Sequence, residues 1–262
     1  MNRRAFLKRV AIGAGGTVGL GTAGYAYGRF EATWLEVAET TIAVPRLPPP
    51  FAGLRVALLT DPHHGRFNSL EYIASVVTTV VGLSPDLIAL GGDFAHGPHG
   101  RKYLAPCLWE LARLKAPLGA FAVPGNHDYY AGITQTRRSV AAAGITDLTN
   151  RGVWLERGGH RLRLGGVDDL ICGNPRPDLA IGEAGPDDAC LILSHNPEVA
   201  ETLIDPRVGL ILAGHMHGGQ VVIPGIGYHY LPARYGDKYV AGLVQGPVVA
   251  AFVSRGVGVI GL

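Results

Sequence analysis

The sequence has little cysteine: its 262 residues include only Cys107, Cys172 and Cys190. No two of them form a C-x-x-C pair, which argues against a structural zinc cluster held by thiolates. Three is an odd number, so at most one disulfide can form, and a scaffold stapled by several disulfides is excluded. Cys190 lies in a buried-strand pattern and Cys107 in a helical one. We expect all three to be small core residues.

Charged residues are also scarce, at 17% of the chain against 47% hydrophobic residues. This composition excludes general disorder and allows a sizeable core, in one large domain or two small ones. The net charge of +2 arises at the N-terminus, because residues 1–30 contain five basic residues and no acidic one. The remaining residues include 18 basic against 21 acidic side chains. Since this part lacks a basic footprint, nucleic acid is not expected as a partner.

A strongly hydrophobic run of membrane-spanning length is absent too. The stretch from Val10 to Tyr27 is only mildly apolar, because glycine, alanine and threonine dominate it. Six glycines, at positions 13, 15, 16, 19, 21 and 24, speak against an amphipathic helix there. The preceding Asn2-Arg3-Arg4-Ala5-Phe6-Leu7-Lys8 resembles the twin-arginine export motif.

We therefore expect residues 1–30 to be a leader that engages the twin-arginine export machinery, either cleaved or retained as an anchor. Residues 31–262 would form one exported domain in the periplasm or cell envelope, with a membrane surface as a potential contact if the leader stays.

What the chain does contain is five short apolar runs, each ending in potential metal ligands. Short apolar runs bounded by glycine or proline predict buried strands. In open α/β sheets ligands bind beyond the carboxyl ends of the strands, so these side chains should meet at one rim. The runs 55–60, 86–90, 119–123, 190–194 and 209–213 are followed, in turn, by Asp61 and His63, by Asp93, by Asn126 and His127, by His195, and by His215 and His217.

The residue types point to two divalent cations. Carboxylate and carboxamide oxygens with neutral imidazoles suit Mn, Fe, Zn or Co. Two cations about 3.5–4 Å apart need a shared anionic ligand, and Asp93 in its glycine-flanked turn is the natural bridge. The alternative, a set of unrelated loop or core residues, fits poorly because five of the ten histidines lie in these strand-end motifs.

The motifs together resemble those of the calcineurin-like metallophosphoesterases, in order and in spacing. The resemblance covers about Leu54 to Gln220 and implies an α/β fold, a four-layer αββα sandwich of two mixed sheets flanked by helices. The metal site would lie at the C-terminal rim of the strands. The motifs are Asp61-x-His63, Gly92-Asp93, Gly125-Asn126-His127-Asp128, His195 and Gly214-His215-x-His217.

The same resemblance implies a role for each of these residues. His127 would contact the scissile phosphate without binding a metal, and Asp128 would fix its tautomer. One metal would be surrounded by Asp61, His63, Asp93 and His217, and the other by Asp93, Asn126, His195 and His215.

Within the family, the chain is most similar to exported bacterial phosphodiesterases related to UDP-2,3-diacylglucosamine pyrophosphatases. This rests on the leader, on Gly218-Gly219-Gln220, and on the stretches around Tyr235 and Ser254-Arg255-Gly256. The resemblance implies hydrolysis of a phosphodiester or diphosphate, with Mn as the first candidate metal, on a lipid-linked or envelope substrate. Acyl chains would then contact Phe67, Tyr129, Tyr130 and Tyr235.

Three other functions remain open from the sequence. The first is a phosphodiesterase for soluble substrates or nucleotides. The second is a catalytically inert module that binds envelope polymers through a metal-organised surface, and the third is a metal hydrolase for bonds without phosphorus. Inert members of the family should have lost ligands, and this chain has every one.

The periodicity predicts the remaining elements. A β-like alternation over 33–44 and a stiff, extended proline-rich connection at 45–50 precede the first strand. Since relatives usually continue beyond a segment such as 257–262, one sheet edge should be exposed or covered by a partner. Helices are expected at 69–81, 102–115, 134–143 and 198–203, and further strands at 154–156, 162–166, 220–223, 239–244 and 248–253.

Three more histidines lie beside the motifs. His64 is expected in the pocket or in solvent, and His96 and His99 in a loop rich in glycine and proline are expected in solvent.

Overall fold

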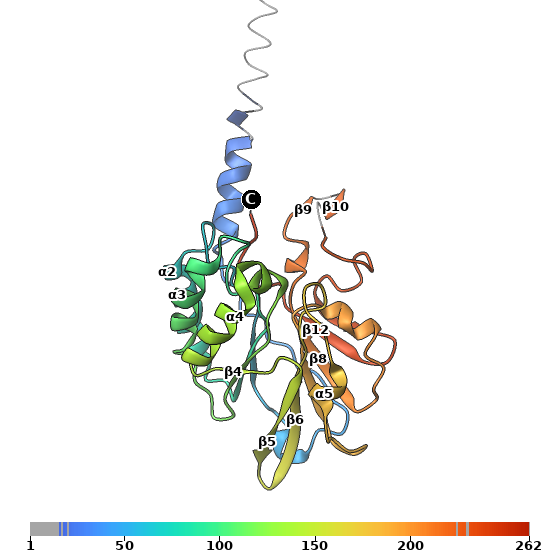
Figure 1. The fold of residues 1–262 in the computed structure, drawn as a ribbon. Coiled ribbons are helices and arrows are strands. Elements are labelled where there is room, and N and C mark those ends of the chain that lie inside the picture. The colour runs from blue at the N-terminus through green and yellow to red at the C-terminus, as the bar shows by residue number, and fades with distance from the viewer. Residues whose placement is uncertain (1–15, 17, 20, 224, 229–230, 262) are drawn as a thin grey trace, which may run out of the picture. The chain divides into compact units, whose positions relative to one another are not determined.

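The computed structural model describes residues 16, 18–19, 21–223, 225–228 and 231–261 of the chain (Figure 1). The twin-arginine segment 2–8 lies outside them. The chain divides into two compact units, one of which is Ala38–Ile260 and contains both main sheets and the candidate site.

The other unit contains a helix over residues 21–31, which corrects our expectation that glycines would exclude a helix in this region. Three of its eleven residues are glycines, and each costs about 1 kcal/mol relative to alanine. At the C-terminal end of the helix, the rings of Phe30 and Trp34 pack edge to face at 5.2 Å. In the part of the chain that the structure describes, no helix has the length and apolar character needed to cross a membrane.

The first sheet consists of four parallel strands in the order β1-β2-β3-β4. We expected two mixed sheets, which is wrong for this sheet because all of its strands are parallel. A helical crossover connects each strand to the next, so each strand starts at the same end of the sheet. Its strands are β1 (Val56–Leu59), β2 (Leu87–Leu90), β3 (Ala120–Ala122) and β4 (Thr146–Asp147).

The second sheet is mixed, with the order β11-β12-β8-β7-β6-β5. The pairs β11–β12 and β5–β6 are antiparallel, whereas the pairs that join β12, β8, β7 and β6 are parallel. Its strands are β5 (Arg151–Arg157), β6 (His160–Gly166), β7 (Cys190–Leu193), β8 (Val208–Ala213), β11 (Gly242–Gln245) and β12 (Ala250–Val253).

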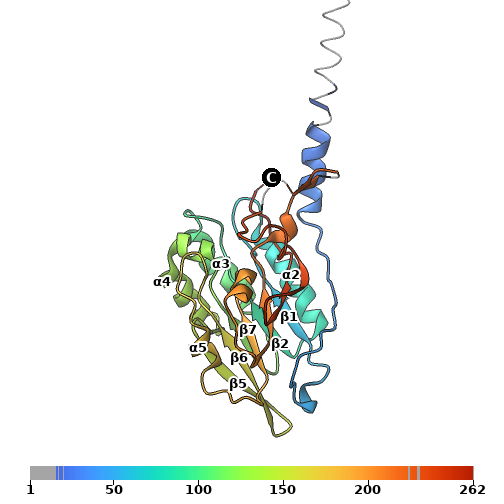
Figure 2. The same cartoon turned by 90° about the vertical axis from the view of Figure 1, so that its right-hand side faces the viewer.

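The two sheets pack face to face. Because alternate side chains of a strand point to opposite faces of its sheet, the core consists of two clusters. Along β7, Leu191 and Leu193 join a cluster with Leu87 of the first sheet, whereas Ile192 packs in a second cluster on the outer face. That outer face is covered by α5 (Pro177–Ile181) and the 3-10 turn η2 (Pro197–Glu201). Figure 1 shows the sheets with helices on both sides, and Figure 2 shows β5, β6 and β7 of the second sheet after a turn of 90°. This α/β sandwich confirms the predicted fold class.

The helices α2 (Leu70–Leu83), α3 (Arg101–Leu111) and α4 (Asn126–Ala142) lie beside the first sheet (Figure 1). The first two match the predicted helices. The third begins eight residues earlier than predicted, directly at Asn126, with non-helical torsion angles at Gly132. The part of α4 that we did not predict contains the Asn-His-Asp motif. This motif therefore lies at the N-terminus of a helix.

Two predictions for the segment that precedes β1 are wrong. Residues 34–44 form no strand, and the connection at 45–50 is not simply extended, since Arg46 has a φ of 59° and η1 (Pro49–Phe51) is a 3-10 turn. The stretch 198–203 forms the 3-10 turn η2 and no α-helix. Cys107 and Cys190 are buried as expected, but Cys172 is only partly buried.

Candidate metal centre

All seven predicted metal ligands come together where strands of the two sheets end. Five short connections deliver them: the segments after β1, β2, β3, β7 and β8. Because β1, β2 and β3 are parallel neighbours, as are β7 and β8, the carboxyl ends of these strands meet at one rim. The buried fractions are high throughout, with relative exposures between 0 and 9% for Asp61, His63, Asp93, Asn126, His195, His215 and His217.

One half of the cluster is built from Asp61, His63 and His217. The Nε2 atoms of the two histidines are 3.1 Å apart. Asp61 Oδ1 lies 3.4 Å from His217 Nε2 and 3.8 Å from His63 Nε2. These three side chains could hold one metal ion, and Asp93 Oδ2 approaches His63 Nε2 to 3.4 Å from the side of the other half.

The other half is built around His195. Its Nε2 atom lies 3.3 Å from Asp93 Oδ2, 3.2 Å from Asn126 Oδ1 and 3.1 Å from His215 Nδ1. The opposite ring nitrogen of His195 is 2.7 Å from the carbonyl oxygen of Gly91, which fixes the orientation of the ring. Asp93 Oδ2 therefore faces both halves, as a bridging carboxylate would.

The donor set fits divalent cations for reasons visible in the structure. Asp61 Oδ1 is buried and receives no hydrogen bond, although two imidazole nitrogens converge on it. A buried carboxylate oxygen without a donor is costly, and a cation between these atoms would satisfy all three. The set contains only oxygen and imidazole nitrogen, as expected for Mn, Fe, Zn or Co.

Backbone strain is concentrated at the same residues. Among the residues that the structure describes, nine non-glycine residues have a positive φ, and five of them are predicted ligands, namely Asp61 (57°), His63 (42°), Asp93 (57°), His215 (71°) and His217 (49°). Each left-handed residue costs about 1–3 kcal/mol and persists only where its surroundings enforce it. The backbone conformation of the turns after β1, β2 and β8 therefore lowers the stability of the fold, but it points these side chains toward the centre.

Glycines allow the turns to approach each other. A Cβ atom on Gly125 would collide with Asp93 Oδ1 and would lie 2.7 Å from the ring of His195. On Gly214 it would collide with Asp61 Oδ2. The glycines of the motifs are thus required by contact with the cluster.

Burial and mutual charge divide the imidazoles into two kinds. Burial holds the pKa of His63 well below its ordinary value, and burial together with the charge of His195 lowers the pKa of His215 to about 4. For His195 burial acts in the same direction, but the charge and hydrogen bond of Asp93 outweigh it and raise the pKa well above its ordinary value. Burial would raise the pKa of Asp93, yet His195 and His63 lower it. In the metal-free protein, the proton on His195 therefore stands in for a cation beside Asp93.

Metal binding should consequently release a proton from His195. Burial lowers the pKa of His63 well below its ordinary value and that of His215 to about 4, so both are already neutral at pH 7 and bind a cation without losing a proton. Affinity should rise with pH until the raised pKa of His195 is reached and then level off, since no proton remains to be displaced. Calorimetric titration of the metal-free protein with Mn²⁺ in buffers of different ionisation enthalpy measures this release. Equal heats in all buffers would contradict it.

His127 lies beside the cluster on α4, and its tautomer is set by the backbone. The N–H of Gly97 donates to His127 Nδ1 at 2.9 Å, so the neutral ring carries its proton on Nε2. The backbone N–H of His127 in turn donates to Asp93 Oδ1 at 2.8 Å. Burial lowers the pKa of His127, which keeps it a neutral donor.

Asp128 does not hold His127 as we predicted. Its carboxylate accepts three backbone N–H groups instead, from Asp93 at 2.8 Å, Phe94 at 3.0 Å and Gly125 at 2.9 Å. At the third position of α4 this carboxylate points back to the start of the helix and across to the turn after β2, as in a capping box. Asp128 thus connects the segments after β2 and β3, which carry predicted ligands. The backbone N–H of Gly97, and not Asp128, fixes the tautomer of His127.

Replacing Asp128 by asparagine should therefore lower stability more than catalysis. The amide would present N–H groups to backbone N–H donors, and a buried group left without a partner costs about 1–3 kcal/mol. We expect urea denaturation of metal-loaded Asp128→Asn to show this loss, with kcat reduced less than about tenfold where the variant is folded. Asp178→Asn, on the surface, is the control and should unfold like the wild type. A fall in kcat of about 10⁴-fold, as seen when a carboxylate fixes a catalytic histidine, would restore the original role.

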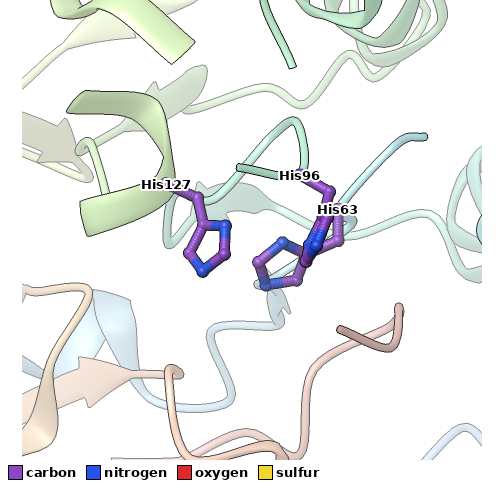
Figure 3. Close-up of side chains that lie close together, drawn as sticks. All are labelled: His63, His96 and His127. Carbon is purple, nitrogen blue, oxygen red and sulfur yellow. The ribbon is translucent and has the colours of Figure 1, made fainter. Parts of the chain in front are cut away.

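His96 is a residue of the centre that we did not predict, since its loop suggested exposure to solvent. It is half-buried, its ring lies 5.0 Å from that of His127 and 5.5 Å from that of His63, and Figure 3 shows the three rings turned toward one another. Its Nδ1 atom is buried without a hydrogen bond. Only its position three residues after Asp93 could have indicated this. His64 is buried and bonded to the carbonyl oxygen of Tyr103, so it is a structural residue.

Two acidic residues after β6 were also missed. Asp169 is fully buried and its Oδ2 atom has no hydrogen bond, while Oδ1 accepts the N–H groups of Ile171 and Cys172. Asp168 accepts a hydrogen bond of 2.6 Å from the hydroxyl of Tyr129. The signal that identified the other ligand segments, a short continuous apolar run, is absent here, because β6 contains His160, Arg161 and Arg163.

Comparison with known proteins agrees with this geometry. Residues 54–219 match the calcineurin-like phosphoesterase family. The uncharacterized metallophosphoesterase YkuE of Bacillus subtilis is 32% identical, over 98% of this chain and 91% of its own. The phosphodiesterase YaeI of Escherichia coli is 31% identical, over 98% of this chain and 93% of its own. Among solved structures, TT1561 of Thermus thermophilus superposes with a TM-score of 0.52 at 17% identity, over 78% of this chain and 90% of that chain, a likeness of fold.

Proposed function

The chain belongs to the calcineurin-like phosphoesterase family of two-metal phosphoester hydrolases, and from this premise we propose that it cleaves phosphodiester bonds in amphiphilic substrates of the cell envelope. The observation that carries the chemistry is the position of Asp93, whose Oδ2 atom faces His63 on one side and His195 on the other at 3.4 and 3.3 Å.

When bound, two cations would lower the pKa of a water nucleophile and neutralise the oxygens of the phosphate. The chain supplies their position: Asp61, His63 and His217 converge on one point, and Asn126, His195 and His215 on another. His127 would donate a hydrogen bond from Nε2 to the phosphoryl or leaving oxygen, because its Nδ1 is occupied by the Gly97 N–H. A donor aimed at developing charge in a buried site contributes strongly to catalysis.

Hydrolysis of bis(p-nitrophenyl) phosphate tests the phosphodiesterase proposal. The full chain, stripped of metal and reloaded with Mn²⁺, should cleave it, and the stripped chain should not. Absence of turnover with Mn²⁺, Fe²⁺, Zn²⁺ and Co²⁺ alike would favour an inert binding module.

The amphiphilic part of the proposal is supported by two exposed aromatic side chains, one of which lies beside the candidate centre. Tyr130 is 46% exposed and its ring lies 5.3 Å from that of His127, and Tyr235 is 47% exposed. Tyr129 and Phe67, which we also expected near acyl chains, are only partly exposed. A larger kcat/KM for a diacyl phosphodiester than for its deacylated analogue tests it, because remote contacts can raise kcat/KM. Equal values would leave a phosphodiesterase for soluble substrates.

Export is the part of the proposal that rests on sequence. Replacing Arg3-Arg4 by Lys-Lys should leave the protein in the cytosol, since the twin-arginine machinery reads that pair. Cell fractionation followed by immunoblotting measures the location, with Arg29→Lys as the control outside the motif. Unchanged envelope localisation of the Lys-Lys variant would contradict the proposal.

A further inference from the structure

A small hairpin stands apart from both main sheets and is apolar on its surface (Figure 1). It consists of β9 (Val222–Ile223) and β10 (Gly227–Tyr228), which form an antiparallel pair and, among the described strands, have no other partner. Its exposed side chains include Val221 (42%), Val222 (55%), Ile226 (80%) and Tyr228 (38%). A lone two-stranded hairpin is marginally stable in water, and exposed apolar residues grouped in this way indicate an interaction site.

The sequence of the hairpin lacks charge. From residue 221 to residue 233 there is no lysine, arginine, aspartate or glutamate. Immediately after this stretch come Arg234 and Tyr235, both exposed. Their backbone N–H groups donate to Glu198 at 2.6 and 3.0 Å, which holds the end of the segment in place. An apolar tip followed by an aromatic and a basic residue is the pattern of elements that lie in a membrane interface.

The base of the hairpin is part of the metal centre. The 3-10 turn η3 (His217–Gly219) begins with a predicted ligand, and the hairpin follows it after two residues. Gly219 has a φ of 78°, and a Cβ atom on it would collide with the ring of Tyr228. Tyr228 therefore packs against the turn that carries His217, so the hairpin and the centre are held together.

Other elements add exposed apolar side chains near the same centre. Tyr130 on α4 contacts the ring of His127, as described above, and Ile171 is 44% exposed. The N–H of Ile171 donates at 3.0 Å to Asp169, a fully buried residue whose pKa is raised by burial although the charge of His195 lowers it. Apolar groups thus reach solvent from three separate elements close to the candidate ligands.

We propose that the hairpin of β9 and β10 is a membrane-contact element that inserts the side chains of Val221, Val222, Ile226 and Tyr228 into the surface of a lipid bilayer and holds the metal centre against phosphodiesters located there. This inference rests on the proposed phosphodiesterase function and specifies where it acts. A bilayer suits the hairpin better than a protein does. A stable protein interface takes about 20 residues or more on each side, whereas the hairpin offers four exposed apolar residues, and a fluid bilayer requires no complementary shape.

Hydrogen–deuterium exchange on the full, metal-loaded chain tests the inference locally. Vesicles of phosphatidylethanolamine and phosphatidylglycerol should slow exchange in peptides covering 221–228, at least about fivefold, because insertion removes the hairpin from water. The variant Ile226→Asp places a charge at the tip and should lose this protection. Exchange outside 221–228 in the absence of vesicles shows whether the variant is folded.

The matched control is Ile204→Asp. Ile204 is 69% exposed, and it precedes β8, whose other end leads to His215, so it lies toward the opposite edge of the sheet. This variant should keep the protection of 221–228. No slowing with vesicles, slowing confined to residues 16–37, or full protection in Ile226→Asp would each overturn the inference. Wild-type turnover of bis(p-nitrophenyl) phosphate without vesicles tests the proposed function separately.

Discussion

Replacing Asp93 by asparagine should remove both cations and lower kcat by about 10³-fold or more. Oδ2 of Asp93 faces His63 and His195, so the substitution takes away the one negative charge that both halves of the centre share. Lewis-acid stabilisation by bound cations is worth several kcal/mol, and each 1.36 kcal/mol corresponds to about tenfold in rate. Elemental analysis of the purified variant and its kcat with saturating Mn²⁺ measure the two effects.

The substitution is chosen so that the fold is kept. The carboxamide of the variant would retain the oxygen that accepts the N–H of His127, and asparagine tolerates a φ of 57° better than other residues do. His217→Ala is the comparison, because His217 contacts only the half that contains Asp61 and His63, and it should lose one metal. Two metals per chain and wild-type kcat in Asp93→Asn would refute the bridging role.

Removing His127 should lower kcat by about 10²–10³-fold while both metals stay bound. Its ring is placed beside His63 at 4.7 Å between centroids, but Nδ1 is occupied by the Gly97 N–H. The remaining nitrogen is a hydrogen-bond donor, and loss of one donor to a charged transition state has an effect of about this size. Measurement of kcat and metal content in His127→Ala tests both parts.

His99→Ala is the control for this variant, since His99 is an exposed histidine in the loop that contains Gly97. It should behave like the wild type. Because burial lowers the pKa of His127, its ring is neutral above the ordinary histidine range, and its donor function should not be lost as the pH rises through about 6.5, the ordinary histidine pKa. Loss of a metal from His127→Ala would make this residue a ligand, and an alkaline decline in that range that vanishes in the variant would make it a charged acid.

The candidate ligands could be predicted from the sequence because each signal is local. An apolar run such as 209–213 becomes a buried strand through its own composition, and His215 and His217 follow within four residues. The carboxyl ends of parallel strands lie on the same side of a sheet. Residues that directly follow these strands in the sequence are therefore expected to be neighbours in space. The same reasoning does not find Asp169, because β6 before it contains Arg161 and Arg163 and is not a continuous apolar run.

The predictions on Asp128, His96 and the start of α4 failed for a different reason. The partners of Asp128 are backbone N–H groups of Asp93, Phe94 and Gly125, and a backbone group is the same in every residue type. No side-chain pattern reveals which carboxylate meets which amide. Likewise, a glycine-rich loop indicates exposure, but the N–H of His96 donates to the carbonyl oxygen of His64 and the N–H of Gly97 donates to His127, and these bonds hold the loop at the centre.

By itself, then, the sequence determined the strands, the α/β class and the chemical identity of the centre, because periodicity and residue type act over a few neighbouring residues. Only the tertiary structure decided that the first sheet is wholly parallel, that Gly97 sets the tautomer of His127, and that an apolar hairpin is packed against the turn of His217. Each of these depends on contacts between segments far apart in the chain. Such contacts form where backbone donors meet acceptors and where packed surfaces are complementary. The side chains of a single segment do not specify either of these.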